Sequence, residues 1–328
     1  MSVYRCRDFI VSEDGLVFSV VSYAHPEDRV VAFLRFVPEG GRLVKAGTTA
    51  GSFRYLEKEH PDYVFFSEVH DAKLQGVPEE RIRELIRPDV FLKDLFGGRK
   101  LDGHEERIRD LAATLSGRSG VSLDLFGVTG SVLVGAHSPA SDVDLVVYGR
   151  DGFERVRRIV SECKLPIVPL GEDDFRAAYE KRFPVSKELS FEEFVFHERR
   201  KFNCGVFEGV KFDVLYVRGV GEAFGSWGDV AYERIGEVSF NGRVVDDSLA
   251  FDYPAVYGVE GDCVFDGRKY TVSEISSFTH TYAGQVFNGE RVEASGILED
   301  ASSPAGVSYR VLVGSSREAS GEYIKNAG

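Results

Sequence analysis

The feature that most constrains this chain is a short apolar segment that carries two acids one residue apart. Asp142 and Asp144 alternate with Val143 and Leu145, and the apolar run continues to Tyr148. Because successive side chains of a strand point to opposite faces, both acids would project from one face while the apolar residues enter the core. Two carboxylates about 5 to 7 Å apart repel each other, and such a pair persists most readily around a divalent cation. We therefore expect a strand that opens a metal site.

A glycine and a serine precede this strand. Gly130 and Ser131 follow the apolar run of residues 121–128, and the ten residues 132–141 separate them from Asp142. Glycine allows a tight turn in which free N–H groups and the serine hydroxyl can face an anion. The turn therefore predicts a site for a polyphosphate.

A third acid, Asp213, lies in a later apolar run, residues 210–217. A carboxylate in such a run is costly unless it is paired or solvated, so Asp213 is a candidate to complete the metal site. Hard oxygen ligands without a His or Cys cluster favour Mg²⁺ or Mn²⁺ over zinc. The cysteines lie far apart and form no C-x-x-C pair, which argues against a zinc ribbon or a disulfide framework and predicts reduced, mostly buried thiols; they are Cys6, Cys163, Cys204 and Cys263.

In combination, these residues resemble the signature of the DNA polymerase-beta-type nucleotidyltransferase superfamily. That signature is a hydrophobic residue, Gly, Gly or Ser, a spacer, and then acid-hydrophobic-acid-hydrophobic. Thr129 stands in the usually hydrophobic first place, Gly130 and Ser131 follow, and residues 142–145 supply the acids. Asp213 lies on a later predicted strand, as the family's third acid does. The resemblance covers the middle of the chain, and the flanking parts are only loosely similar to uncharacterised archaeal proteins of the superfamily.

The resemblance implies an enzyme that transfers a nucleotidyl group from a nucleoside triphosphate to a hydroxyl acceptor and releases pyrophosphate. Asp142 and Asp144 would bridge two Mg²⁺ or Mn²⁺ ions, and Asp213 would ligate the ion that activates the acceptor. Gly130 and Ser131 would hold the β- and γ-phosphates. A non-catalytic nucleotide-binding or interaction module that retains the fold is the alternative.

The source of positive charge for the phosphates is open in the sequence. The family's common G-S-x-A-R-G run is broken, because residues 132–135 contain no arginine. Residues 199–201, Arg-Arg-Lys, end a predicted helix before the strand of Asp213, where they could reach a triphosphate or compensate the helix dipole; we favour the second. An N-terminal patch near the active site is a further alternative, comprising Arg29, Arg35, Arg42 and Lys45.

Three histidines near these motifs carry weaker signals. His137 lies in the loop before the acid pair and could touch the nucleotide, but a loop histidine without a partner is expected to be solvated. His104 and His197 lack the second histidine that a helical zinc site needs, so we expect both at the surface.

Changes of pattern divide the chain into three expected units and predict an α/β + β protein. Residues 1–102 form an N-terminal α+β domain with a three-stranded meander, a helix after Gly51 and a second helix behind Pro78. Residues 103–235 form a polymerase-beta-like catalytic domain with a mixed sheet. Residues 236–328 nearly lack helical periodicity and form a β-rich domain, a small and possibly OB-like β-barrel or a sandwich.

Charge and hydropathy limit the partners. Lys and Arg number 40 against 53 Asp and Glu, a formal net charge of −13. An acidic surface repels phosphate backbones, so a nucleic-acid partner would need a local basic patch. The expected partners are a nucleoside triphosphate and an acceptor left open between an RNA end, a protein and a small molecule, the charge favouring the last two. No stretch approaches ~18 uninterrupted apolar residues, so we expect no membrane contact and a cytoplasmic protein.

Overall fold

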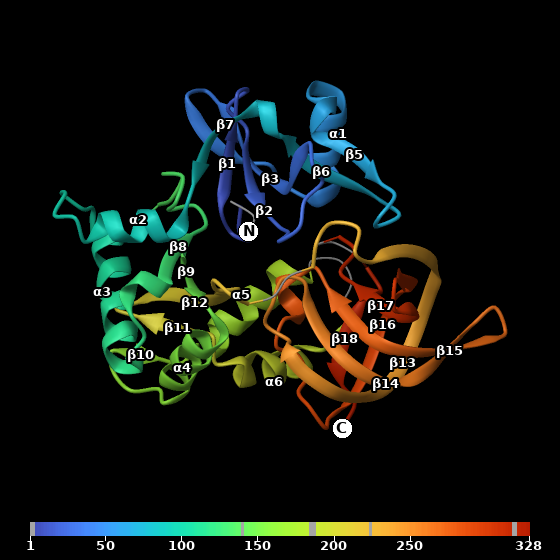
Figure 1. Cartoon of the computed structure of the whole chain (residues 1–328). Coiled ribbons are helices and arrows are strands. Elements are labelled where there is room, and N and C mark those ends of the chain that lie inside the picture. Colours follow the sequence, from blue (N-terminus) through green and yellow to red (C-terminus); the bar gives the residue numbers. More distant parts are fainter. Residues whose placement is uncertain (1–3, 139–140, 184–187, 223–224, 317–319) are drawn as a thin grey trace.

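The computed structural model describes residues 4–138, 141–183, 188–222, 225–316 and 320–328. An N-terminal sheet, a central α/β unit and a C-terminal sheet meet at a common junction (Figure 1). Within these residues, no helix combines the length and the apolar character needed to cross a membrane.

The N-terminal unit is a seven-stranded sheet in the order β5-β6-β3-β2-β1-β7, with β4 paired to β3. The expected meander is confirmed as β1, β2 and β3. The expected helix after Gly51 is also confirmed, although it begins slightly earlier, where the Thr48 side chain accepts a hydrogen bond from the Gly51 N–H. The elements are β1 (Phe9–Ser12), β2 (Val17–Val20), β3 (Arg29–Glu39), β4 (Arg42–Lys45), α1 (Thr49–Glu59), β5 (Val64–Ser67), β6 (Ala72–Pro78) and β7 (Ile82–Ile86).

The helix expected behind Pro78 is wrong. Residues 82–86 form strand β7, which runs antiparallel to β1 with Ile86 opposite Phe9 and Leu85 opposite Ile10. An apolar run this short is compatible with both the helical and the strand period, and its pairing with β1 makes it a strand.

The central unit contains a five-stranded mixed sheet in the order β10-β11-β12-β9-β8. Strands β9 and β12 run parallel, and the other neighbours run antiparallel. Helices α3 and α4 cover one face, where Leu111 and Phe153 share a buried core with Leu145 and Phe212. The elements are α2 (Pro88–Leu95), α3 (Gly103–Ser119), β8 (Phe126–Thr129), β9 (Val143–Tyr148), α4 (Arg150–Ser161), β10 (Ile167–Val168), α5 (Glu172–Arg182), α6 (Phe191–Lys201), β11 (Cys204–Phe207) and β12 (Val210–Val217).

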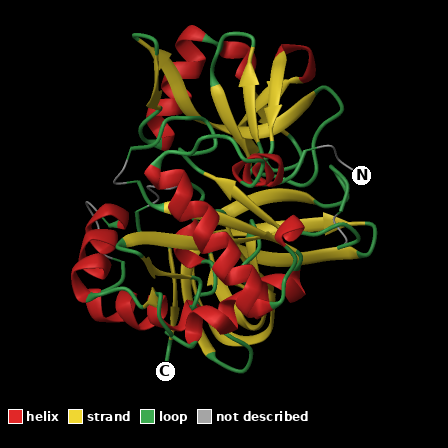
Figure 2. Ribbon diagram, turned by 90° about the vertical axis from the view of Figure 1, so that its left-hand side faces the viewer, coloured by secondary structure: helices red, strands yellow, loops and turns green. Residues whose placement is uncertain are grey.

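The expected β-rich C-terminal unit is confirmed. Its strands pair in the order β13-β14-β15-β17-β16-β18, and β16 pairs again with β13. Its core is shared with α5 and α6, because Phe175 and Phe194 pack with Phe240 and Tyr257. Figure 2 shows helices packed in front of strands in the lower half of the molecule. The strands are β13 (Ala231–Leu249), β14 (Ala255–Phe265), β15 (Arg268–Ser277), β16 (Arg291–Ser303), β17 (Gly306–Val313) and β18 (Tyr323–Asn326).

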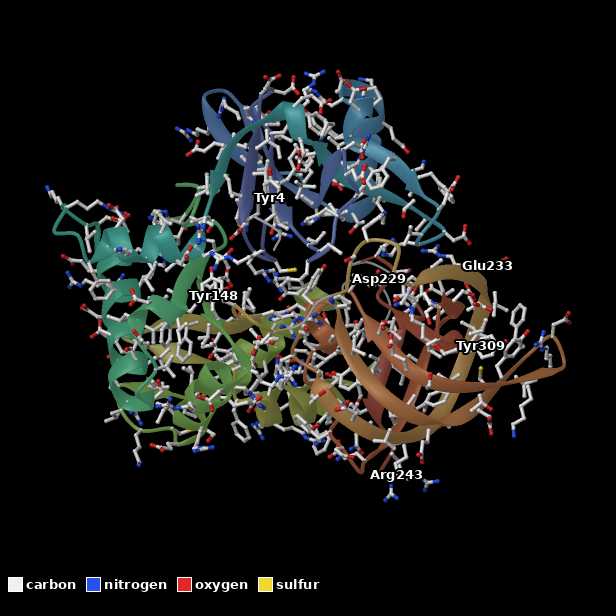
Figure 3. The ribbon with its side chains drawn as sticks, viewed as in Figure 1. Tyr4, Tyr148, Asp229, Glu233, Arg243 and Tyr309 are labelled. Atoms are coloured by element: carbon white, nitrogen blue, oxygen red, sulfur yellow. The ribbon has the colours of Figure 1, made fainter. Side chains whose placement is uncertain are left out.

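Polar contacts fix the three units at their junction. The Arg218 side chain, directly after β12, donates from Nε to Asp252 Oδ2 of the C-terminal unit at 2.6 Å. The Arg218 backbone N–H donates to the hydroxyl of Tyr23 in the N-terminal unit at 3.0 Å. Tyr148, at the end of β9, lies where the central unit meets the N-terminal one, and the Arg5 guanidinium stands 4.3 Å from the centre of its ring (Figure 3). The sheet face opposite α3 and α4 therefore looks into this junction.

Candidate active site

The two strand acids lie side by side on the junction face of the central sheet. Asp144 of β9 and Asp213 of β12 are partners in the register of the parallel pair. Residues paired across neighbouring strands point to the same face, and the neighbours Val143 and Phe212 point into the core below. On the other side of Asp144, its antiparallel partner is Thr129. The fold therefore brings together acids that are 69 positions apart in the sequence, 213 minus 144.

Burial and mutual repulsion perturb both carboxyl groups. Burial, with the charges of Asp144 and Asp142 acting in the same direction and that of Arg182 opposing them, raises the pKa of Asp213 to about 7. Burial also raises the pKa of Asp144, where the Asp142 charge acts in the same direction. Asp142 precedes β9 and is exposed. The charge of Asp142 thus acts on both strand acids, and the charge of Asp144 acts on Asp213.

The three predicted acids have no partner among the residues that the structure describes and could act as metal ligands. None of the three carboxylates forms a hydrogen bond or an ion pair with a described residue. Carboxylate oxygens are the ligands that Mg²⁺ and Mn²⁺ prefer, and a cation would relieve the repulsion between Asp144 and Asp213. In the described part of the chain, no three Asp, Glu, His or Cys side chains are yet close enough to form a complete metal cluster. The residue types fit a divalent ion, and Asp144 and Asp213 are the two candidate ligands that the strand pairing places side by side.

The glycine-serine turn lies directly against Asp144. Gly130 has a φ of +76°, in the left-handed region that favours glycine, and a Cβ built there would collide with the Asp144 carboxylate. The turn is closed by the Ala136 N–H, which donates to the Ser131 carbonyl at 2.8 Å. The N–H groups of Ser131 and Val132 donate to no described residue. The turn therefore brings Gly130 against Asp144 and leaves the next two backbone N–H groups available to an anion.

Comparison with known proteins identifies the family of the central unit. The family model described as a nucleotidyltransferase domain matches residues 108–211, which include the turn and the acids before and in β9. An uncharacterized protein of Methanocaldococcus jannaschii is 36% identical over 341 residues, covering 98% of this chain and 98% of the relative. The chain belongs to the nucleotidyltransferase family. No solved structure matches it. Asp213 lies two positions beyond the matched span, 213 minus 211.

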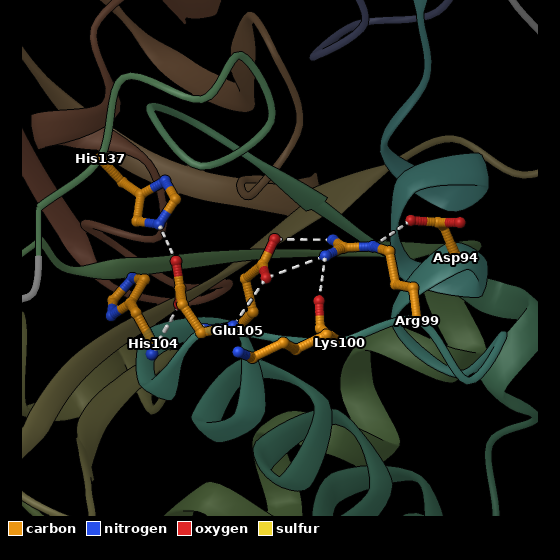
Figure 4. Close-up of polar contacts among 7 residues, drawn as sticks. Asp94, Arg99, Lys100, His104, Glu105 and His137 are labelled. Atoms are coloured by element: carbon orange, nitrogen blue, oxygen red, sulfur yellow. Dashed lines mark hydrogen bonds and ion pairs between the residues drawn. The ribbon is translucent and has the colours of Figure 1, made fainter.

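The loop histidine His137 contacts other residues of the protein. His137 Nε2 lies 3.1 Å from Asp102 Oδ2, and its ring stacks on His104 with centroids 5.3 Å apart (Figure 4). The other Asp102 oxygen caps α3 by accepting from the N–H groups of His104 and Glu105. The expectation of a solvated His137 is therefore wrong, and the contact fixes the loop between the turn and the acid pair to the start of α3.

The expectation that His104 and His197 are surface residues is also wrong. His104 is 3% exposed and His197 is 2% exposed. His197 Nδ1 lies 2.9 Å from the Gln285 carbonyl, so it belongs to the contact between α6 and the C-terminal unit. The partners of these two histidines, His137 and Gln285, are distant in sequence, so no local pattern predicts the burial.

Two basic residues at the end of α6 serve packing between the central and the C-terminal unit. The Lys201 Nζ is buried and donates to Glu198 Oε1 at 2.6 Å and to the Thr281 carbonyl at 2.7 Å. Arg200 pairs with Glu290. These two cations hold α6 to the C-terminal unit, and neither interpretation of residues 199–201 foresaw that role.

Three cations outside the glycine-serine and acid motifs influence the site. The charges of Arg7 and Arg35 in the N-terminal unit, and of Lys181 near the end of α5, all lower the pKa of Asp144 against the larger effect of burial. Of the expected N-terminal patch, Arg35 thus acts on the site, whereas Arg29 pairs with Asp28 at 2.7 Å. No sequence motif around Arg7 predicts a role at the site.

Proposed function

We propose that this nucleotidyltransferase transfers a nucleoside monophosphate from a nucleoside triphosphate to a hydroxyl acceptor and releases pyrophosphate, in a reaction that depends on Mg²⁺ or Mn²⁺. The observation that carries the proposal is the in-register pair of Asp144 and Asp213, without protein partners, beside the Gly130 turn. An unpaired, partly buried acid pair costs stability, and such costs are typical of functional sites.

The site residues have separate tasks in this proposal. Asp142, Asp144 and Asp213 would hold two divalent ions, which when bound supply a lowered pKa for the attacking hydroxyl and charge neutralisation for the leaving pyrophosphate. The free N–H groups after Gly130, with the Ser131 hydroxyl, would bind the β- and γ-phosphates and orient the α-phosphate for in-line attack.

The flanking units would frame the acceptor. We infer three domains close to residues 1–102, 103–235 and 236–328, except that α2 packs with the central unit and β13 begins at Ala231. We also infer that the pairing of β13 with both β14 and β16 closes the C-terminal sheet into a small OB-like barrel. The acceptor stays open between an RNA end, a protein and a small molecule, and the net charge of −13 favours the last two.

The test is a survey of transfer products. The full chain is incubated with each of the four triphosphates, labelled at the α-phosphate, together with Mg²⁺ and either RNA or protein from a cell extract. We expect label to become covalently attached to one class of acceptor, with release of pyrophosphate, and the Asp144→Asn variant to attach none. Triphosphate binding without transfer or pyrophosphate release in any mixture would contradict the proposal and favour the non-catalytic module.

A further inference from the structure

The loop after the glycine-serine turn contributes no positive charge to a triphosphate. Residues 131–141 contain no Lys or Arg. The first part of the loop is buried, since Val132 joins the core of the central sheet and Leu133 packs against Phe9 and Phe36 of the N-terminal sheet. The loop is therefore apolar because it attaches the central unit to the N-terminal one.

The N-terminal sheet places an arginine at this same attachment. Arg7 lies just before β1, and its carbonyl accepts a hydrogen bond of 3.0 Å from the hydroxyl of Thr129, the residue before Gly130. The Arg7 guanidinium stands 5.0 Å from the centre of the Tyr253 ring in the C-terminal unit. Contacts to two units thus fix both ends of this residue beside the turn.

Arg7 has no counter-ion among the described residues. No carboxylate lies within ion-pair distance of it, and its Nε is buried without a hydrogen-bond partner. Its neighbour Arg5, by contrast, pairs with Asp89 at 2.9 Å, and Arg218 pairs with Asp252 at 2.6 Å. In a chain of net charge −13, an arginine held at a junction without an acid partner points to an anion that arrives from outside.

Arg7 lies next to the acid pair, because Thr129, whose hydroxyl donates to the Arg7 carbonyl, is the register partner of Asp144. Arg35 on β3 directly precedes Phe36, which packs with Leu133. Both arginines belong to the unit that receives Leu133, so the unit that buries the loop also supplies the cations that the loop lacks. A guanidinium offers five donors in a fixed plane and binds phosphate oxygens in pairs.

We propose that Arg7, with Arg35 as a second and outer cation, binds the β- or γ-phosphate of the nucleoside triphosphate, so that the nucleotide site extends beyond the nucleotidyltransferase domain into the N-terminal unit. This inference rests on the proposed function. It identifies the triphosphate, and not the base or the acceptor, as the group that the N-terminal unit recognises.

The experiment compares binding of a triphosphate and its monophosphate by calorimetry with Mg²⁺ present. The full chain is used as wild type, Arg7→Gln, Arg7→Lys and, as a control that removes the same charge from the same unit, Arg29→Gln. Arg7→Gln should weaken triphosphate binding about tenfold to a hundredfold and change monophosphate binding far less. Arg7→Lys should retain part of the affinity, and Arg29→Gln should bind like wild type.

The outcomes separate this inference from the proposed function. A folded Arg7→Gln variant that binds the triphosphate as tightly as wild type overturns the role of Arg7 and leaves the proposed function standing. A wild-type chain that binds none of the four triphosphates overturns both. If Arg7→Gln does not fold by thermal unfolding, Arg35→Gln decides: a severalfold loss for the triphosphate alone supports the inference, and unchanged binding overturns it.

Discussion

Replacing Asp213 by asparagine should stabilise the metal-free protein. Burial, followed by the charge of Asp144, raises the pKa of Asp213 from 3.8 to about 7. A pKa difference of about 3 corresponds to about 4 kcal/mol, an upper figure because the side chain keeps some contact with solvent. Since the folded-state pKa is the higher one, stability that is present below about pH 4 is lost as the pH rises to about 7. Asparagine does not ionise and escapes this loss.

Urea unfolding with EDTA measures the effect at pH 4 and pH 8. Asp213→Asn should exceed wild type by up to about 4 kcal/mol at pH 8 and nearly equal it at pH 4. Asp124→Asn, at an exposed acid, is the matched control and should change stability by less than about 0.5 kcal/mol at either pH. A gain of equal size at both pH values, or a variant less stable than wild type at pH 8, would refute the reasoning.

Three further substitutions test other parts of the site and its support. Asp144→Asn should fold normally and lose on the order of a thousandfold or more in turnover, and normal turnover by the purified variant would refute its assignment. Gly130→Ala and Gly135→Ala both place a side chain at positive φ and should each lower the free energy of unfolding in urea by about 1 to 2 kcal/mol. Only the Gly130 variant places its Cβ against a site residue, Asp144, so only this variant should abolish triphosphate binding in calorimetry. Equal binding by the two variants would count against the phosphate turn. Lys201→Met removes one partner of the buried Glu198 carboxylate and should destabilise the chain by about 3 kcal/mol in urea unfolding, whereas a neutral result would show that Arg182 alone satisfies that acid.

The central sheet could be predicted because its signals are local. Asp144 alternates with apolar residues in β9, and Asp142 directly precedes that strand. Helix α6 spans the predicted residues 191–201 because Ser190 caps it and Glu193 returns the hydrogen bond. The hairpin of β11 and β12 turns at Glu208 and Gly209, both at positive φ, and the Gly marked it in the sequence. Each of these features is decided within about a dozen residues.

What could not be predicted depends on partners far away in the chain. Residues 82–86 are a strand because β1 accepts them, and His104 is buried because a loop more than 30 positions later stacks His137 on it. Arg7 lies more than 120 positions before the turn that it accompanies, so no spacing rule connects it to Gly130. The site thus combines a local motif, which sequence patterns predict, with contacts between units, which they do not.

Manganese binding tests the central claim, that Asp142, Asp144 and Asp213 hold divalent ions beside the turn at Gly130. The full chain is titrated with Mn²⁺ in the presence of a non-hydrolysable triphosphate, and bound ions are counted by electron paramagnetic resonance. Wild type should bind two ions per chain, and the Asp144→Asn and Asp213→Asn variants should lose one or both. Wild-type binding no tighter than that of a variant lacking all three carboxylates would contradict the claim.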